Sequence, residues 1–136
     1  MTVLLVDVAN VVGSRPDGWW RDRKGAAERL LTRLASLVGR RLPGPDGGDV
    51  TVEQVIAVVE GKARDATSPE GIRVVRAQGS GDDALAECAA ALAAEGVFPL
   101  AVTADRGLRA RLPAGTAVTG PGWLLAALDA ADPPSA

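Results

Sequence analysis

The feature that most constrains the fold of this chain is a series of short, apolar runs separated by stretches with helical periodicity. The first run, Val3 to Val6, is rich in β-branched residues and ends at Asp7. A short, continuously apolar run predicts a strand buried on both faces, as in a parallel sheet. Strands that alternate with helices are typical of right-handed crossovers, with helices shared between the two faces. The sequence therefore predicts a single-domain, three-layer α/β/α fold with a mainly parallel, five-stranded sheet.

The expected elements follow this alternation along the chain. An amphipathic helix is predicted over 22–38, since its apolar positions recur at helical spacing, and a Pro/Gly-rich loop is predicted over 42–49. The other predicted elements are strands at 50–59, 72–76, 99–103 and 116–119 and helices at 80–95, 106–111 and 120–130. We expect one domain over 1–130 and a flexible C-terminal tail over 131–136.

The residue types available exclude several kinds of chemistry. The chain has no histidine and a single cysteine, Cys88. This composition excludes Ser-His-Asp hydrolysis, imidazole acid/base catalysis and zinc sites built from histidine or several cysteines. Cys88 lies in step with Leu85 and Leu92 on a predicted helix, which indicates a core position rather than a nucleophile. Carboxylates are therefore the chief candidates for catalysis or metal binding.

The charge of the chain is nearly balanced overall but uneven along its length. The formal net charge is -2 and the pI is near 5.1, so a polyanionic partner must be held by a local patch or by a metal ion. Between residues 11 and 41, eight basic residues stand against three acidic ones. We find neither a signal peptide nor an apolar run approaching ~20 residues, which predicts a cytoplasmic protein with no membrane partner.

Acidic residues follow four of the predicted strands. Asp7 ends the first strand, Glu60 the second, Asp82 and Asp83 come after the third, and Asp105 follows the fourth. Ligands of open α/β sheets bind outside the carboxyl ends of the strands, so we expect these side chains to converge. Gathered carboxylates raise each other's pKa unless a divalent cation compensates, and their hard oxygen atoms suit Mg²⁺ or Mn²⁺.

Most of these acids also have a simpler explanation. Asp82 or Asp83 would complement a helix N-terminus, Asp105 would cap the short helix after it, and Glu60 would be a solvated turn residue. For Asp7 no capping role is expected, because no helix is predicted for about a dozen residues after it. An uncompensated carboxylate after a buried strand is costly to desolvate, so Asp7 is the strongest candidate for a cation ligand.

Four segments of the chain resemble the NYN (YacP-like) branch of the PIN-domain nuclease superfamily. They are, in order, LLVDVANVV, VVEGKAR, GIRVVRAQGSGDDALAE and LAVTADRGLRARLPAG, and the resemblance extends from Val3 to about Leu128. Its most specific parts are the D-x-x-N of Asp7 and Asn10 and the T-A-D-R at 103–106. The resemblance implies a PIN-like, Rossmann-like fold and a metal-dependent ribonuclease.

The same resemblance implies roles for individual residues. It makes Asp7 a metal ligand with Asn10 as its neighbour, and adds an acid at Asp82 or Asp83 and another at Asp105. Relatives commonly carry Asp where this chain has Glu60, whose longer side chain leaves its place among the ligands open. The implied mechanism is phosphodiester hydrolysis by metal-activated water, which with two cations would give a 5′-phosphate and a 3′-hydroxyl. The predicted catalytic and metal-binding residues are Asp7, Asp82, Asp83 and Asp105, with Glu60 as a further metal ligand.

The loop after the first strand, residues 11–24, is expected to overhang this site and to bind RNA. Trp19 and Trp20 are predicted to stack on bases while neighbouring arginines contact phosphates. The alternative is that the tryptophans anchor the loop to the core and that the basic residues form a solvated face. Arg106 would contact a phosphate oxygen, or would simply be solvated. The full set of predicted substrate-binding residues is Asn10, Arg15, Trp19, Trp20, Arg21, Arg23, Ser80 and Arg106.

Residues 79–84 spell G-x-G-x-x-A between a strand and a helix, a pattern found at dinucleotide sites. Two aspartates stand where a pyrophosphate would bind, and the pattern follows the third strand rather than the first, so this interpretation is the weakest. The leading hypothesis is a ribonuclease that uses Mg²⁺ or Mn²⁺, with RNA as its partner and a homodimer or a regulatory protein partner left open. The alternative is a non-catalytic PIN-like RNA-binding or adaptor domain.

Overall fold

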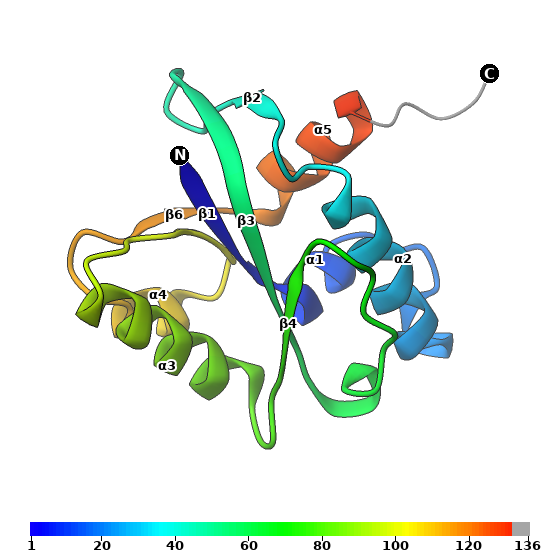
Figure 1. Ribbon diagram of the computed structural model, residues 1–136. Coiled ribbons are helices and arrows are strands. Elements are labelled where there is room, and N and C mark those ends of the chain that lie inside the picture. Colours follow the sequence, from blue (N-terminus) through cyan, green and yellow to red (C-terminus); the bar gives the residue numbers. More distant parts are fainter. Residues whose placement is uncertain (132–136) are drawn as a thin grey trace.

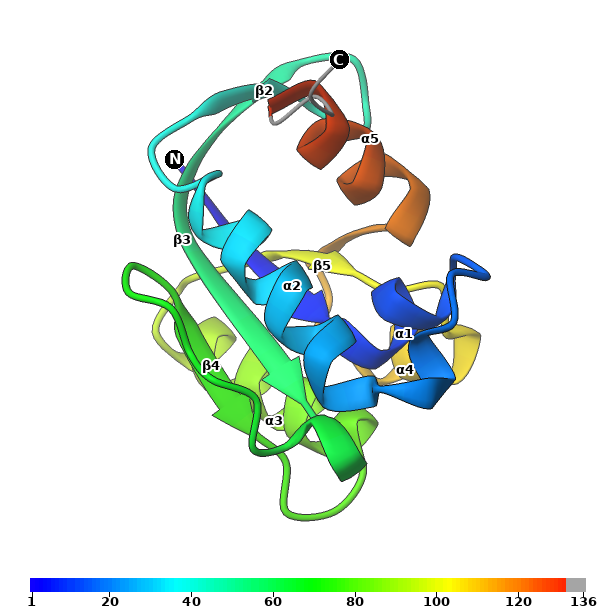
Figure 2. The same cartoon turned by 90° about the vertical axis from the view of Figure 1, so that its right-hand side faces the viewer.

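The computed structural model describes residues 1–131, so that the tail predicted over 131–136 lies, apart from Ala131, outside the described residues. The parallel strands are β1 (Thr2–Asp7), β3 (Asp49–Val59), β4 (Arg73–Arg76), β5 (Leu100–Val102) and β6 (Ala117–Thr119). β1 pairs with β3 on one side and with β5 on the other, and the order continues outward to β4 and β6 (Figures 1 and 2). The predicted mainly parallel α/β sheet is confirmed.

A short strand that the sequence did not reveal extends this sheet. β2 (Arg41–Pro43) pairs antiparallel with the start of β3. The prediction placed a loop over 42–49 because proline and glycine dominate that stretch, and the loop does turn the chain back between the two strands. Arg41 also forms an ion pair with Asp49 at 2.9 Å across the pair. The prediction was therefore wrong for the first two residues of the stretch, which lie in β2, and for Asp49, which begins β3.

All four predicted helices are present with small shifts at their ends. They are α2 (Arg23–Ala35), α3 (Gly81–Ala94), α4 (Arg106–Arg111) and α5 (Pro121–Ala131). The structure adds a helix that was not predicted, α1 (Val8–Gly13), and two single-turn 3₁₀ segments, η1 (Trp19–Arg21) and η2 (Gly61–Ala63). The expectation that no helix follows Asp7 for about a dozen residues is wrong, because α1 begins at the next residue.

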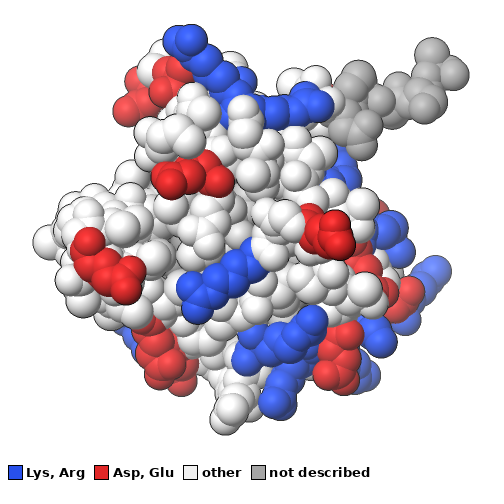
Figure 3. Space-filling model, viewed as in Figure 1, with Lys and Arg blue, Asp and Glu red and all other residues white. Residues whose placement is uncertain are grey.

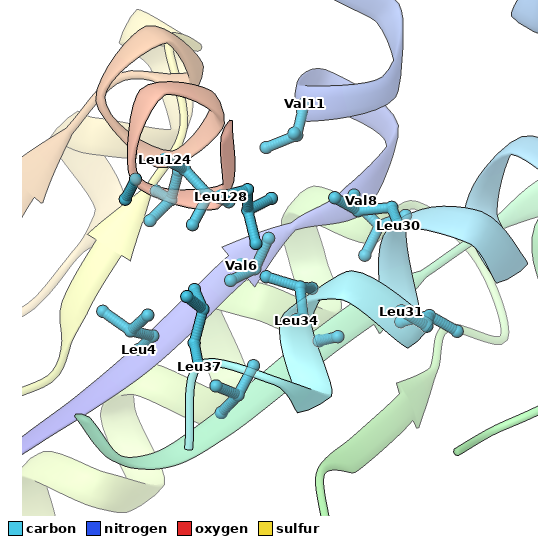
Figure 4. Close-up of a cluster of buried hydrophobic side chains, with 14 of the residues drawn as sticks. Leu4, Val6, Val8, Val11, Leu30, Leu31, Leu34, Leu37, Leu124 and Leu128 are labelled. Atoms are coloured by element: carbon cyan, nitrogen blue, oxygen red, sulfur yellow. The ribbon is translucent and has the colours of Figure 1, made fainter. Parts of the chain in front are cut away.

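Helices cover both faces of the sheet, as predicted. α1, α2 and α5 lie on one face, and α3 and α4 lie on the other (Figures 1 and 2). The alternation of side chains along β1 divides the core, since Leu4 and Val6 point to the first face and Leu5 to the second. Figure 4 shows leucines of α2 and α5 packed around Leu4 and Val6. Each fully buried leucine contributes roughly 1.5–3 kcal/mol of hydrophobic stabilisation.

The surface of the molecule is mixed in charge. On the face that carries α3, β4 and α2, basic and acidic side chains are interspersed among neutral ones (Figure 3). Within residues 1–131, no helix is both long enough and apolar enough to cross a membrane. A distinctive arrangement of charge occurs instead at the carboxyl ends of the parallel strands.

Candidate functional site

The chain reverses its direction of travel across the sheet at β1. It proceeds from β1 to β3 and β4 on one side, and then returns to β5 and β6 on the other. Crevices that bind ligands lie at such switch points, outside the carboxyl ends of the strands. Asp7 ends β1, Glu60 follows β3, and Asp105 lies three residues after the end of β5. Acids from three neighbouring strands therefore share one edge of the sheet.

Asp7 is buried, with 7% of its surface exposed. Its Oδ1 accepts a hydrogen bond from the backbone N–H of Asn10 at 3.3 Å, so that Asp7 caps α1, contrary to the prediction. Its Oδ2 accepts from the Thr103 hydroxyl at 3.0 Å. Burial raises the pKa of Asp7 above its ordinary value, these two hydrogen bonds counteract the shift, and the charges of Asp82 and Glu60 add to it. The negative charge of Asp7 is therefore only partly compensated.

Polar contacts tie the end of β1 to the loop after β5. The Thr103 side chain is 1% exposed, and its hydroxyl oxygen also accepts from the backbone N–H of Asp105 at 3.1 Å. Asn10 Oδ1 accepts from the backbone N–H of Ala104 at 2.8 Å. Asn10, predicted to contact substrate, thus uses its amide oxygen to position the loop. The T-x-D spacing of Thr103 and Asp105 was visible in the sequence, but no role was predicted for Thr103.

Asp105 and Asp82 approach this edge from two helix N-termini. Asp105 caps α4, since its Oδ1 accepts from the backbone N–H of Leu108 at 2.9 Å. Asp82 lies in the first turn of α3. Partial burial raises the pKa of Asp82, the charges of Asp105 and Glu60 raise it further, and Arg111 opposes the shift. Arg111 therefore compensates only part of the repulsion between Asp82 and the other carboxylates.

Asp83, the neighbour of Asp82, is in a different environment. Its carboxylate forms an ion pair with Arg111 at 2.8 Å, and its side chain is 62% exposed. Its backbone N–H donates to Ser80 Oγ at 3.1 Å, so Ser80, predicted to contact substrate, caps α3. Of the two adjacent acids, the structure groups Asp82 with the other carboxylates and pairs Asp83 with a cation.

Glu60 is half-buried against the start of α3 and is not a solvated turn residue. Its Oε2 accepts from the backbone N–H of Gly81 at 2.8 Å. A Cβ atom at position 81 would lie 2.6 Å from Glu60 Oε1, so only glycine leaves room for the carboxylate in this position. The longer side chain of Glu60 thus reaches across from β3 to the helix N-terminus, where the backbone dipoles favour negative charge.

Four carboxylates therefore influence one another at this edge: Asp7, Glu60, Asp82 and Asp105. Their oxygen atoms are of the type that Mg²⁺ and Mn²⁺ prefer. Within residues 1–131, however, no group of three or more Asp, Glu or Cys side chains is already arranged to hold a metal ion. The donor set fits a hard divalent cation, and the side chains need rearrangement to bind it.

The residues predicted to bind RNA separate into two groups. Trp19 and Glu60 line the same hollow, and the guanidinium of Arg23 lies 5.4 Å from the centre of the Trp19 ring. Trp20 is 51% exposed and meets Trp19 edge to face at 6.1 Å, with Arg21 5.9 Å from the centre of the Trp20 ring. The remaining two lie elsewhere: Arg15 is bound to Asp129 on α5 at 2.9 Å, and Arg106 is exposed at the start of α4.

Comparison with known proteins identifies the fold. No family model matches the chain, and no curated protein matches it by sequence. Two crystal structures of Rae1 (YacP) from Bacillus subtilis match it in structure. The W164L mutant superposes with a TM-score of 0.70 at 19% identity, covering 97% of this chain and 77% of that one. The other has a TM-score of 0.70 at 18% identity, covering 97% and 76%. The likeness confirms the predicted PIN-like fold and the resemblance to YacP at the level of structure.

Proposed function

We propose that this chain is a ribonuclease that hydrolyses RNA phosphodiester bonds with the help of Mg²⁺ or Mn²⁺. The observation that carries the proposal is the gathering of Asp7, Glu60, Asp82 and Asp105 at the switch point, where the pKa of Asp7 and of Asp82 is raised. Uncompensated carboxylates at a ligand-binding edge are typical of functional sites rather than of stable surfaces. The fold shared with Rae1 (YacP) and the resemblance to the NYN branch support the same activity.

In this proposal Asp7, Asp82 and Asp105 hold the cation, and Glu60 adds a ligand from the side of α3. A bound divalent cation would lower the pKa of water and neutralise charge on the phosphate. Thr103 and Asn10 keep Asp7 and the loop after β5 in place through the hydrogen bonds described above. Arg106 stands next to Asp105 and is free to contact a phosphate oxygen from outside the cluster.

The test is cleavage of single-stranded RNA by the whole chain with Mn²⁺ and with excess chelator. Asp7→Asn and Asp105→Asn are the informative variants, because asparagine caps a helix as well as aspartate does and the fold should persist. We expect each variant to lose at least about a hundredfold in rate. Asp129→Asn, an exposed carboxylate on α5, is the matched control and should cleave normally. Normal cleavage by both site variants would refute the proposal.

A second candidate is a non-catalytic RNA-binding or adaptor domain. The observation that favours it is that Asp7, Glu60 and Asp105 already have structural partners and form no ready-made metal site within the part of the chain that is described. It predicts that the wild-type chain and Asp7→Asn bind RNA equally in chelator and that no preparation cleaves it. Cleavage that requires Mn²⁺ and Asp7 would eliminate this candidate.

A further inference from the structure

A hollow of about 270 Å³ opens beside the carboxylate cluster, and of the residues that line it only Glu60 takes part in the chemistry proposed above. It lies between α1, the start of α2 and the turn that follows β3. Its floor is apolar and its rim is charged. The residues that define it best are Val8, Val12, Trp19, Arg23, Glu60 and Lys62.

We infer that this hollow receives one nucleobase of the RNA strand, the base next to the phosphate that lies at the carboxylates. The inference rests on the proposed function for the position of the phosphate. An apolar cavity of about 150 Å³ binds benzene, so the volume here suits one heteroaromatic base and is too small for a folded segment of protein. The volume lies just below the usual range for pockets that take larger ligands, roughly 300–1,000 Å³.

The walls of the hollow fit a flat ring. Trp19 supplies an indole, and the guanidinium of Arg23 adds a second planar group 5.4 Å from the centre of that indole. Trp20 packs against Trp19 in a T-shaped arrangement, with 87° between the ring planes, and so holds the indole in place. Tryptophan and arginine planes are the groups on which unpaired bases stack.

The position of the hollow connects it to the cluster. Val8 follows Asp7 directly in the chain, and Glu60 belongs both to the rim of the hollow and to the carboxylate group. A base inside the hollow would therefore bring its own phosphate towards Asp7. Lys62 and Arg23 are exposed at the rim, where their positive charges complement a phosphate backbone entering between them. An uncharged apolar side chain from a protein partner would make no use of these two cations.

The experiment measures the binding of short single-stranded RNAs, each with one base removed, to the whole chain with Asp7 retained, in Ca²⁺, a hard cation that takes the same kind of oxygen ligand. Fluorescence anisotropy gives the dissociation constant, and a gel verifies that the RNA stays intact. We expect removal of the base at one position to weaken binding roughly tenfold, and removal elsewhere to matter less. Ala9→Leu, which fills the hollow from an exposed position on α1, and Trp19→Ala should each abolish this difference between positions.

Two further variants separate stacking from a general effect on the fold. Trp19→Phe keeps a flat ring and should retain most of the sensitivity at that position. Ala90→Leu places the same bulk on an exposed residue of α3, away from the hollow, and should leave the profile unchanged. If Trp19→Ala fails to fold, Ala9→Leu still gives the answer, because it keeps the indole.

The inference is overturned if no position is sensitive, if the sensitivity persists in both Ala9→Leu and Trp19→Ala, or if the chain binds no RNA. Its failure can be told apart from failure of the proposed function. A wild-type chain that binds with a Trp19-dependent base preference and never cleaves would refute the ribonuclease and leave the base site standing. A chain that cleaves RNA without any such preference would refute the base site and leave the ribonuclease standing.

Discussion

Two regions of this molecule treat an aspartate in opposite ways. On the surface between α2 and α5, Asp129 accepts hydrogen bonds from Arg33 and Arg15, both at 2.9 Å, and these contacts lower its pKa. At the carboxyl edge of the sheet, burial raises the pKa of Asp7, and other carboxylates are its charged neighbours. In the first arrangement, the arginines neutralise the carboxylate without a bound ligand. The second leaves negative charge for a cation to neutralise, which is why we place the function there.

The largest expected effect is the response of stability to Mn²⁺. A cation that binds only the folded state at a hundred times its dissociation constant stabilises by about 2.7 kcal/mol. For a chain of this size we expect a rise in Tm of roughly 5–15 °C, measured by thermal unfolding with Mn²⁺ and with chelator. Asp7→Asn should lose most of the rise, and Asp129→Asn should keep it. An equal rise in all three proteins would break the comparison, because the cation would then bind elsewhere.

The next effect concerns Thr103, which contacts both Asp7 and the backbone of Asp105. Thr103→Val keeps the shape and removes the hydroxyl, so the two acids lose their common contact. Groups that orient metal ligands typically change affinity or activity about 10–100-fold, and we expect cleavage and Mn²⁺ affinity to fall within that range. Thr103→Ser should restore both. If Thr103→Val lowers only Tm and leaves the Mn²⁺ dissociation constant unchanged, the residue is purely structural.

A smaller effect should follow from Gly81→Ala. The added methyl group would displace the Glu60 carboxylate, which is the end of a flexible side chain and can move at little cost. We expect a change in the free energy of unfolding below about 1 kcal/mol, since alanine is the better helix former. Mn²⁺ affinity should fall several-fold if Glu60 is a ligand. Gly122→Ala in α5, where a Cβ meets nothing within 4 Å, is the control. Unchanged Mn²⁺ affinity in Gly81→Ala would remove Glu60 from the proposed site.

The smallest effects are on the pH dependence of stability without metal. Because the pKa values of Asp7 and Asp82 are raised, their folded forms hold protons that the unfolded chain releases, and stability falls as pH rises above the ordinary aspartate value. Asp129 has a lowered pKa, so its contribution is present above that value and is lost on acidification. The measurement is urea unfolding in chelator between pH 3 and pH 7. The loss of stability with rising pH should be smaller in Asp7→Asn, and the loss of stability on acidification should be smaller in Asp129→Asn. If the free energy of unfolding changed with pH in the same way in both variants, the contrast between Asp7 and Asp129 would be contradicted.

Much of the fold followed from hydrophobic pattern, because a buried parallel strand and an amphipathic helix each impose a recognisable period. The failures occurred where local composition was ambiguous. The helix α1 is a single short element of sequence VANVVG, and its valines resemble the continuation of a strand. The strand β2 contains a proline, and it forms because β3 offers it hydrogen bonds, which no local pattern reveals.

The candidate site was predictable as a set of positions and not as an arrangement. The carboxyl ends of parallel strands meet at one edge, so the acids that follow them could be grouped from the sequence. Which of Asp82 and Asp83 joins the group depends on Arg111, a residue of α4 that no motif connects to them. Glu60 reaches α3 only because residue 81 is a glycine, and that fit between distant segments needs coordinates.

Asp7 and Asp105 each begin a helix with the same carboxylate that belongs to the charged cluster. Each of these carboxylates therefore has two roles. Replacing one of its oxygen atoms by the amide nitrogen of asparagine removes the negative charge and leaves the helix cap in place. A lineage that acquired asparagine at either position would keep a well-formed domain and would lose one negative charge of the carboxylate cluster. In the function proposed above, such a protein would pass, in one mutational step, from cutting an RNA strand to merely binding it.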